Sequence, residues 1–180
     1  QLINDGKVGD YHLPSKCVTL AAGNREKDGG SFFQMSPALE NRFSHVELDI
    51  DYNGFVKYIA GQGYDETMVS FLVFNEKENK DYLYKPTPGN GNFPTFRSWE
   101  KSLQMVRYGA NPENAIYDTV GGHLSTEYQI FKELTKDIPD GQTLVKKGTY
   151  FAEVPLQIVA AQKVGNLLTL PDNLAALQKE

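Results

Sequence analysis

Cysteine is almost absent from this sequence, which has Cys17 alone among its 180 residues. An internal disulfide is therefore excluded, and we expect Cys17 to be a small core residue at the start of a buried strand. Long hydrophobic runs are also missing. No apolar stretch approaches the roughly 20 residues that a membrane-spanning helix needs, and the first residues lack a signal-peptide pattern. These absences predict a cytoplasmic protein with no membrane partner.

Basic clusters and metal-ligand spacings are missing as well. The net charge is −5 and no block of lysine or arginine occurs, which argues against nucleic acid as a partner. Three acidic residues alternate within residues 47–51, where a solvated strand face is a better interpretation than a metal site. The histidines are scattered, so a metal hydrolase is discounted and no metal site is expected; they are His12, His45 and His123.

The sequence also lacks the parts that hold a nucleoside triphosphate. A phosphate-binding loop needs glycines that end in Gly-Lys-Ser/Thr, and residues 147–149 read Lys-Gly-Thr, the wrong order. A magnesium-binding Asp-Glu pair should close an apolar strand, whereas Asp65-Glu66 follows Gly63-Tyr64. We therefore expect that this chain alone neither binds ATP tightly nor hydrolyses it.

What the sequence does contain begins with an apolar run at residues 18–22 that ends at Gly23-Asn24. The run predicts a buried parallel strand, and the carboxyl ends of such strands are where open α/β sheets bind ligands. A polar loop is expected over residues 25–30. A short helix should follow, with Ser36 as N-cap and Pro37 as its first residue, and Arg42 near its end.

Other patterns complete the expected fold. Turn signals in residues 4–16 suggest a short hairpin or an extended link, and alternation over residues 46–50 predicts a half-buried strand. Helices are expected after that, with caps at Asp51 or Asn53, at Asp65, at Thr95 and at Asn111. Arg97 then lies in the first turn of a helix that Trp99 anchors in the core. Two further helices are expected near residues 154–161 and 167–177.

A family resemblance rests on three of these stretches. The strand ending in Ala-Ala-Gly-Asn24, the Pro-Ala-Leu-Glu-Asn-Arg42-Phe segment and the Pro-Thr-Phe-Arg97-Ser-Trp segment occur in this order. They resemble the sensor-1, arginine-finger and sensor-2 motifs of MoxR-like AAA+ ATPases. The resemblance covers residues 1 to about 139, without the family's Walker A and Walker B motifs. It implies catalytic roles for Asn24, Arg42 and Arg97, with Asn24 and Arg97 contacting the nucleotide.

The resemblance also implies a fold and a domain organisation. The fold class is α/β: residues 1–51 would be a remnant of the AAA+ parallel-sheet core, and residues 52–139 an all-α lid domain. Residues 140–180 would form a C-terminal tail whose role the sequence does not indicate. Because the chain begins with Gln1 in what looks like the middle of an element, we expect a fragment of a longer protein.

Two functions follow, of different classes. In the first, the chain is the C-terminal part of an ATPase that uses ATP and Mg²⁺, forms a ring, usually a hexamer, and remodels or assembles partner proteins. In the second, it is a catalytically inert interaction module that kept only the sensor half. An upstream reading frame that encodes the missing phosphate motifs would favour the first, and a start codon just before Gln1 would favour the second.

Overall fold

The computed structural model describes residues 2–24, 34–87, 89, 91–148 and 151–169. The chain divides into two units, residues 1–49 and residues 50–180. The expected polar loop at residues 25–30 and most of the expected helix at residues 167–177 lie outside the described residues. Among the helices that are described, none is long and apolar enough to cross a membrane.

The described residues of the first unit contain little regular structure. They form a one-turn helix α1 (Leu2–Asp5), a hairpin of β1 (Lys7–Val8) and β2 (Tyr11–His12), and a short helix α2 (Pro37–Glu40). The hairpin is antiparallel and pairs Lys7 with His12, which confirms the hairpin expected from the turn signals. Ser36 occupies the N-cap position of α2, although its side chain makes no capping hydrogen bond.

The α/β fold class is wrong for the described residues. They are mostly helical and contain no parallel sheet, only the two-stranded hairpin. The apolar residues of both expected strands are largely exposed, at 83% for Val18, 91% for Leu20, 79% for Val46 and 83% for Leu48. Cys17, expected in the core, is exposed too.

The physical reason for this correction is pairing. An extended apolar segment becomes a stable strand only when neighbouring strands satisfy its backbone and a packed layer covers its side chains. In the described part of the first unit, residues 18–22 and 46–49 have neither, and no side chain there is buried. The predicted strands are therefore wrong, because an apolar alternating pattern does not by itself supply a pairing partner.

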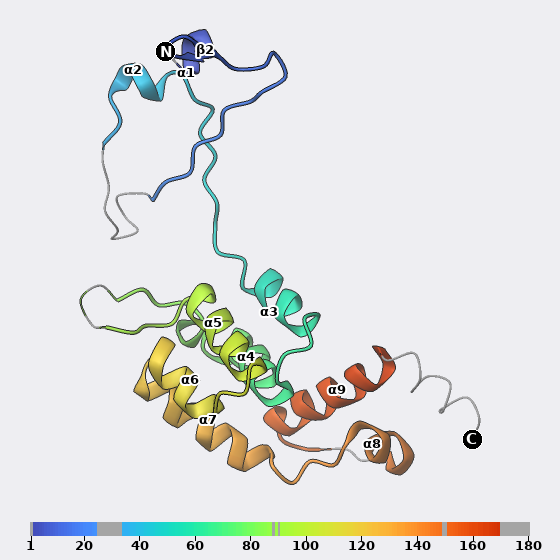
Figure 1. The fold of residues 1–180 in the computed structure, drawn as a ribbon. Helices are drawn as coiled ribbons and strands as arrows, with labels where there is room; N and C mark the ends of the chain where they lie inside the picture. The colour runs from blue at the N-terminus through green and yellow to red at the C-terminus, as the bar shows by residue number, and fades with distance from the viewer. Residues whose placement is uncertain (1, 25–33, 88, 90, 149–150, 170–180) are drawn as a thin grey trace. The chain divides into compact units, whose positions relative to one another are not determined.

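The second unit is a bundle of helices (Figure 1). Several of its helices begin where a local capping signal predicted them, because an N-cap oxygen accepts one of the backbone N–H groups that a helix leaves unpaired. Asp51 accepts from Gly54 N, Asp65 from Met68 N, and Asn111 from Asn114 N. The elements are α3 (Tyr52–Ala60), α4 (Glu66–Glu78), the 3₁₀ turn η2 (Lys80–Tyr82), α5 (Phe96–Arg107), α6 (Pro112–Thr119), α7 (Gly122–Thr135), α8 (Gly141–Lys147) and α9 (Val154–Thr169).

Trp99 lies at the centre of this bundle and is fully buried, as expected. Its ring contacts Phe71 of α4, with 5.9 Å between ring centroids. Its indole Nε1 donates a hydrogen bond of 2.8 Å to the carbonyl oxygen of Tyr82. One side chain therefore ties α5 to both α4 and the turn that follows it.

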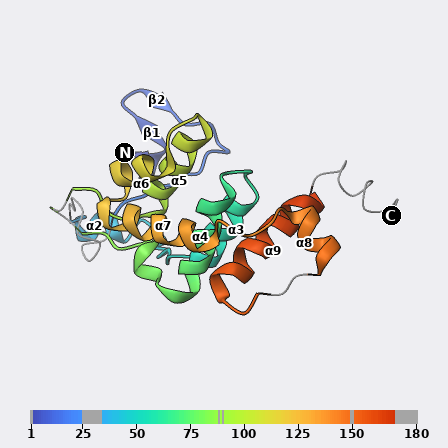
Figure 2. The same ribbon diagram turned by 90° about the horizontal axis from the view of Figure 1, so that it is seen from below.

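The segment from residue 140 onward also belongs to the second unit. Helices α8 and α9 lie side by side in both views (Figure 1 and Figure 2), and α9 packs against α4 and α7. Val159 is buried in this contact, and Lys163 Nζ donates to the carbonyl oxygen of Ile138 at 2.8 Å. The sequence did not predict α8, which Asp140 caps through the backbone N–H of Thr143.

Candidate functional site

The first turn of α5 positions Arg97. Thr95 and Ser98 form a reciprocal capping box: Ser98 N donates to Thr95 Oγ1 at 3.0 Å, and Thr95 N donates to Ser98 Oγ at 2.8 Å. The Ser98 hydroxyl also donates to the carbonyl oxygen of Phe93 at 3.0 Å. These bonds fix the backbone on both sides of Arg97, because they satisfy donors that the first turn would otherwise leave unpaired.

Arg97 lines a small cavity of about 270 Å³ at this helix start. The guanidinium belongs to an exposed residue, and within the described residues no carboxylate lies within ion-pair distance of it. Lys101, one helical turn further along, lines the same cavity, and Asp118 at the end of α6 brings a negative charge. The lining residues are Gly91, Asn92, Phe93, Thr95, Arg97, Ser98, Lys101, Asp118 and Thr119.

Asn92 connects the loop before α5 with the end of α6 and lines the cavity between them. Its side-chain Nδ2 donates to the carbonyl oxygen of Asp118 at 2.7 Å, near the end of α6. Since the last carbonyls of a helix have no partner within it, this bond stabilises both the helix end and the loop that carries Asn92. Ser102 reinforces the contact of α5 with α6 by donating to the carbonyl oxygen of Ala115.

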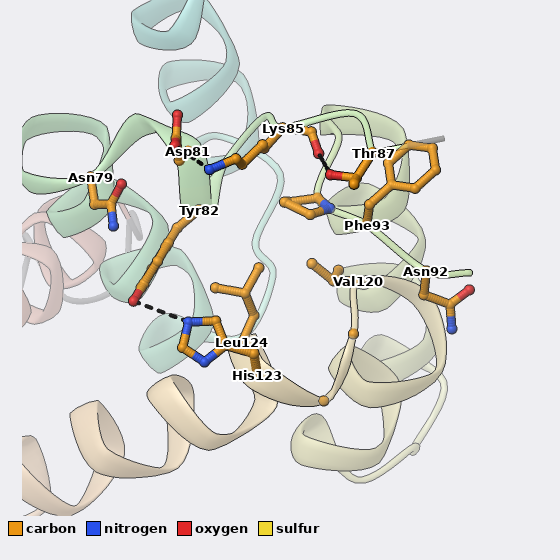
Figure 3. Close-up of a pocket in the computed structure, with 13 residues that line it drawn as sticks. Asn79, Asp81, Tyr82, Lys85, Thr87, Asn92, Phe93, Val120, His123 and Leu124 are labelled. Atoms are coloured by element: carbon orange, nitrogen blue, oxygen red, sulfur yellow. Dashed lines mark hydrogen bonds and ion pairs between the residues drawn. The ribbon is translucent and has the colours of Figure 1, made fainter. Parts of the chain in front are cut away.

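A second, larger cavity of about 500 Å³ adjoins the first, and Asn92 and Phe93 line both. Figure 3 shows the Tyr82 hydroxyl pointing at the His123 ring, with 3.4 Å between Tyr82 Oη and His123 Nε2. Lys85 Nζ binds Asp81 Oδ2 at 2.8 Å. The cavity therefore combines a polar rim with apolar side chains, including Val120 and Leu124.

The other two predicted site residues belong to the first unit. Asn24 is exposed in a segment without regular secondary structure, and no hydrogen bond between described residues holds its side chain. Arg42 is exposed and its Nη1 donates to the carbonyl oxygen of Ala38 at 3.0 Å, one turn back in its own chain segment. The structure thus groups Arg97 with Lys101 and Asp118 in the second unit, whereas Asn24 and Arg42 belong to the first unit.

Sequence reasoning missed Lys101 and Asp118 as cavity residues. Lys101 carries a signal that could have found it, because residues four apart on a helix share one face. Asp118 has no such signal, since it reaches the cavity only through the packing of α6 against α5. His123 lies in the first turn of α7, whose N-cap is Gly121, and its ring contacts that of Tyr82.

No group of three or more metal-ligating side chains gathers among the residues that the structure describes. Searches of protein-family models, of curated proteins and of solved structures find no match to this chain.

Proposed function

We propose that the chain is the sensor and lid part of a MoxR-like AAA+ ATPase. In this proposal it senses and stimulates the hydrolysis of ATP, which drives the remodelling or assembly of partner proteins. The observation that supports it most directly is Arg97: an exposed guanidinium in a capped first turn, beside a cavity and a second cation. A planar guanidinium suits bidentate binding of phosphate oxygens better than any other side chain does.

Each predicted residue has a distinct role in this proposal. Arg97 contacts the phosphates of the nucleotide in its own subunit, and Asn24 orients the attacking water. Arg42 reaches the nucleotide of the neighbouring subunit in a ring, which is a hexamer in most such proteins. Catalysis of phosphoryl transfer consists mainly of positioning and charge stabilisation, so a neutral amide and two cations are useful parts. The guanidinium of Arg42 has five N–H donors, and its hydrogen bond to the carbonyl oxygen of Ala38 uses one of them.

ATP and Mg²⁺ need further residues in this scheme, because the described cavity offers no phosphate loop and no magnesium-binding carboxylate pair. We therefore expect the 180-residue chain alone to show no ATPase activity. Calorimetric titration of the chain with ATP should give an affinity weaker than millimolar. Binding at millimolar affinity or better would contradict the proposal that ATP and Mg²⁺ need further residues.

The decisive test is the reading frame upstream of the Gln1 codon. A frame that continues into Gly-x-x-x-x-Gly-Lys and then into an apolar strand ending in Asp-Glu would support the ATPase. A start codon directly before Gln1 would refute it and leave the second candidate.

In a protein that carries those motifs, Arg42→Ala should abolish ATP turnover while nucleotide affinity stays unchanged, because this cation acts on the neighbouring subunit. Lys57→Ala is the matched control: Lys57 is an exposed cation on α3 that lines neither cavity, and its removal should leave turnover unchanged. Equal turnover in the Arg42 variant and the Lys57 variant would show that Arg42 is not an arginine finger.

The second candidate function is a catalytically inert interaction module. The exposed apolar side chains of residues 18–20 and 46–48 favour it, since exposed apolar surface marks contact sites. This candidate predicts that Arg42 and Arg97 can both be replaced without loss of partner binding. The ATPase proposal predicts that replacing either arginine lowers ATP turnover in a protein that carries the phosphate-binding motifs.

A further inference from the structure

Lys101 lies on α5 one helical turn after Arg97 and is also a cation. The two residues are four apart in one helix, so their side chains project from the same face, and the spacing between their Cβ atoms is roughly 6 Å. Both line the same cavity. Both are exposed, and within the described residues neither forms an ion pair.

This arrangement lacks a structural explanation within the fold. Like charges four residues apart on a helix repel each other, and here no carboxylate of the described chain neutralises them. The adjacent Glu100 accepts a hydrogen bond from the Tyr58 hydroxyl at 2.9 Å, on the side of α3. Asp118 lines the same cavity, yet lies beyond ion-pair distance of both cations. The cavity therefore carries two positive charges against one negative charge.

We propose that Lys101 is a second phosphate-binding residue and that this cavity takes a chain of two or more phosphate groups. A di- or triphosphate carries more negative charge than a single phosphate group and can contact the two cations with separate phosphate groups, so we expect it to depend more on the second cation. The inference rests on the proposed function, in which Arg97 contacts the nucleotide, and adds the residue that selects for the length of the phosphate chain. Asp118 opposes the ligand and lowers its affinity.

The test is an NMR titration of the 180-residue chain with sodium tripolyphosphate, repeated with orthophosphate at the same ionic strength. Binding to the wild type is expected at concentrations above millimolar, with shifts of the Arg97 Nε–Hε and Lys101 Hε signals. Lys101→Gln and Arg97→Gln should each weaken tripolyphosphate binding about two- to fivefold, as exposed charge contacts do. Lys57→Gln, an exposed lysine outside the cavity, should change nothing. Orthophosphate affinity should fall less in the Lys101 variant than tripolyphosphate affinity does.

A second variant tests the sign of the electrostatics. Asp118→Asn removes the opposing charge and should tighten tripolyphosphate binding about twofold, consistent with a surface charge contact. Amide spectra of all variants should match the wild type outside the cavity, because the replaced side chains are on the surface.

The outcomes separate the two proposals. If Arg97→Gln weakens tripolyphosphate binding and Lys101→Gln does not, the role of Lys101 is refuted and that of Arg97 is supported. If neither variant changes the affinity, or if tripolyphosphate shifts no signal of Arg97 and Lys101, the cavity is not a phosphate site and both roles fail. Equal losses for orthophosphate and tripolyphosphate would refute the selection for chain length alone.

Discussion

Replacing Trp99 with phenylalanine should destabilise the helical unit more than any conservative change on its surface. The indole is fully buried between α4 and α5, and its N–H donates to the carbonyl oxygen of Tyr82 at 2.8 Å. Phenylalanine keeps one aromatic ring but loses both that donor and the atoms of the second ring. The carbonyl of Tyr82 then loses its side-chain partner.

The magnitude follows from two contributions. Leaving a buried acceptor unpaired costs about 1–3 kcal/mol, and the lower half of that range applies because the bond to the Tyr82 carbonyl is only partly buried. The lost ring atoms correspond to about two buried carbons, which contribute about 0.8 kcal/mol each before any cavity penalty. Together these give a loss of about 3 kcal/mol, which is a large part of the 5–15 kcal/mol by which typical domains are stable.

The assay is urea unfolding followed by far-ultraviolet circular dichroism, because the variant lacks the only tryptophan of the chain. Tyr108→Phe is the matched control: Tyr108 is 88% exposed, so its free energy of unfolding should change by less than about 0.5 kcal/mol. A loss below about 1 kcal/mol for the Trp99 variant would show that the indole hydrogen bond and its packing do not hold α5 as described.

Three further predictions concern other parts of the chain. Burial opposes ionisation of Glu113, but the hydrogen bond from Lys132 at 2.7 Å, the hydrogen bonds from the backbone and from Asn111, and the charge of Lys132 together outweigh it and lower the pKa of Glu113 below its usual value. The contribution of this ion pair to stability is therefore complete at neutral pH and lost as the pH falls through the lower folded-state pKa. Glu113→Gln should lower the free energy of unfolding, followed by thermal melts, by about 0.5–1 kcal/mol at pH 7 and by less at pH 3. Gly121→Ala should cost about 1–3 kcal/mol in urea unfolding, because φ is +125° and the new Cβ would lie 3.2 Å from the carbonyl oxygen of Asn92; Gly165→Ala, in a helix with open space around it, should be neutral or stabilising. Leu20→Lys should change stability by less than about 0.5 kcal/mol, and a loss above about 2 kcal/mol would contradict its exposure.

The helices were predictable because their signals are local. Asp51, Asp65, Thr95 and Asn111 each cap the helix that directly follows them, and a cap depends on only four consecutive residues. The position of Arg97 in a first turn could be predicted for the same reason. Helix α8 was missed although Asp140 is also a local cap, since residues 141–147 carry too short an apolar pattern to indicate a helix by themselves.

The strands could not be predicted because their stability is not local. Residues 18–22 and 46–50 have the apolar pattern of strands, yet a strand requires hydrogen bonds to neighbours that may come from anywhere in a chain. Asp118 illustrates the same limit within the candidate site. It follows Arg97 by twenty-one residues and enters the cavity only because α6 packs on α5 and Asn92 binds its carbonyl oxygen.

Helix α5 connects the core with the candidate site through two stripes of side chains. Trp99 and Leu103 are four residues apart and fully buried, whereas Arg97 and Lys101 are four apart and exposed. At 3.6 residues per turn, residues 97 and 99 point in nearly opposite directions, so the packing of one stripe presents the other to solvent. The spacing between the two cations is then a property of the helix itself. Any ligand that needs both cations depends on α5 being folded, which would link the proposed phosphate binding to the stability that Trp99 provides.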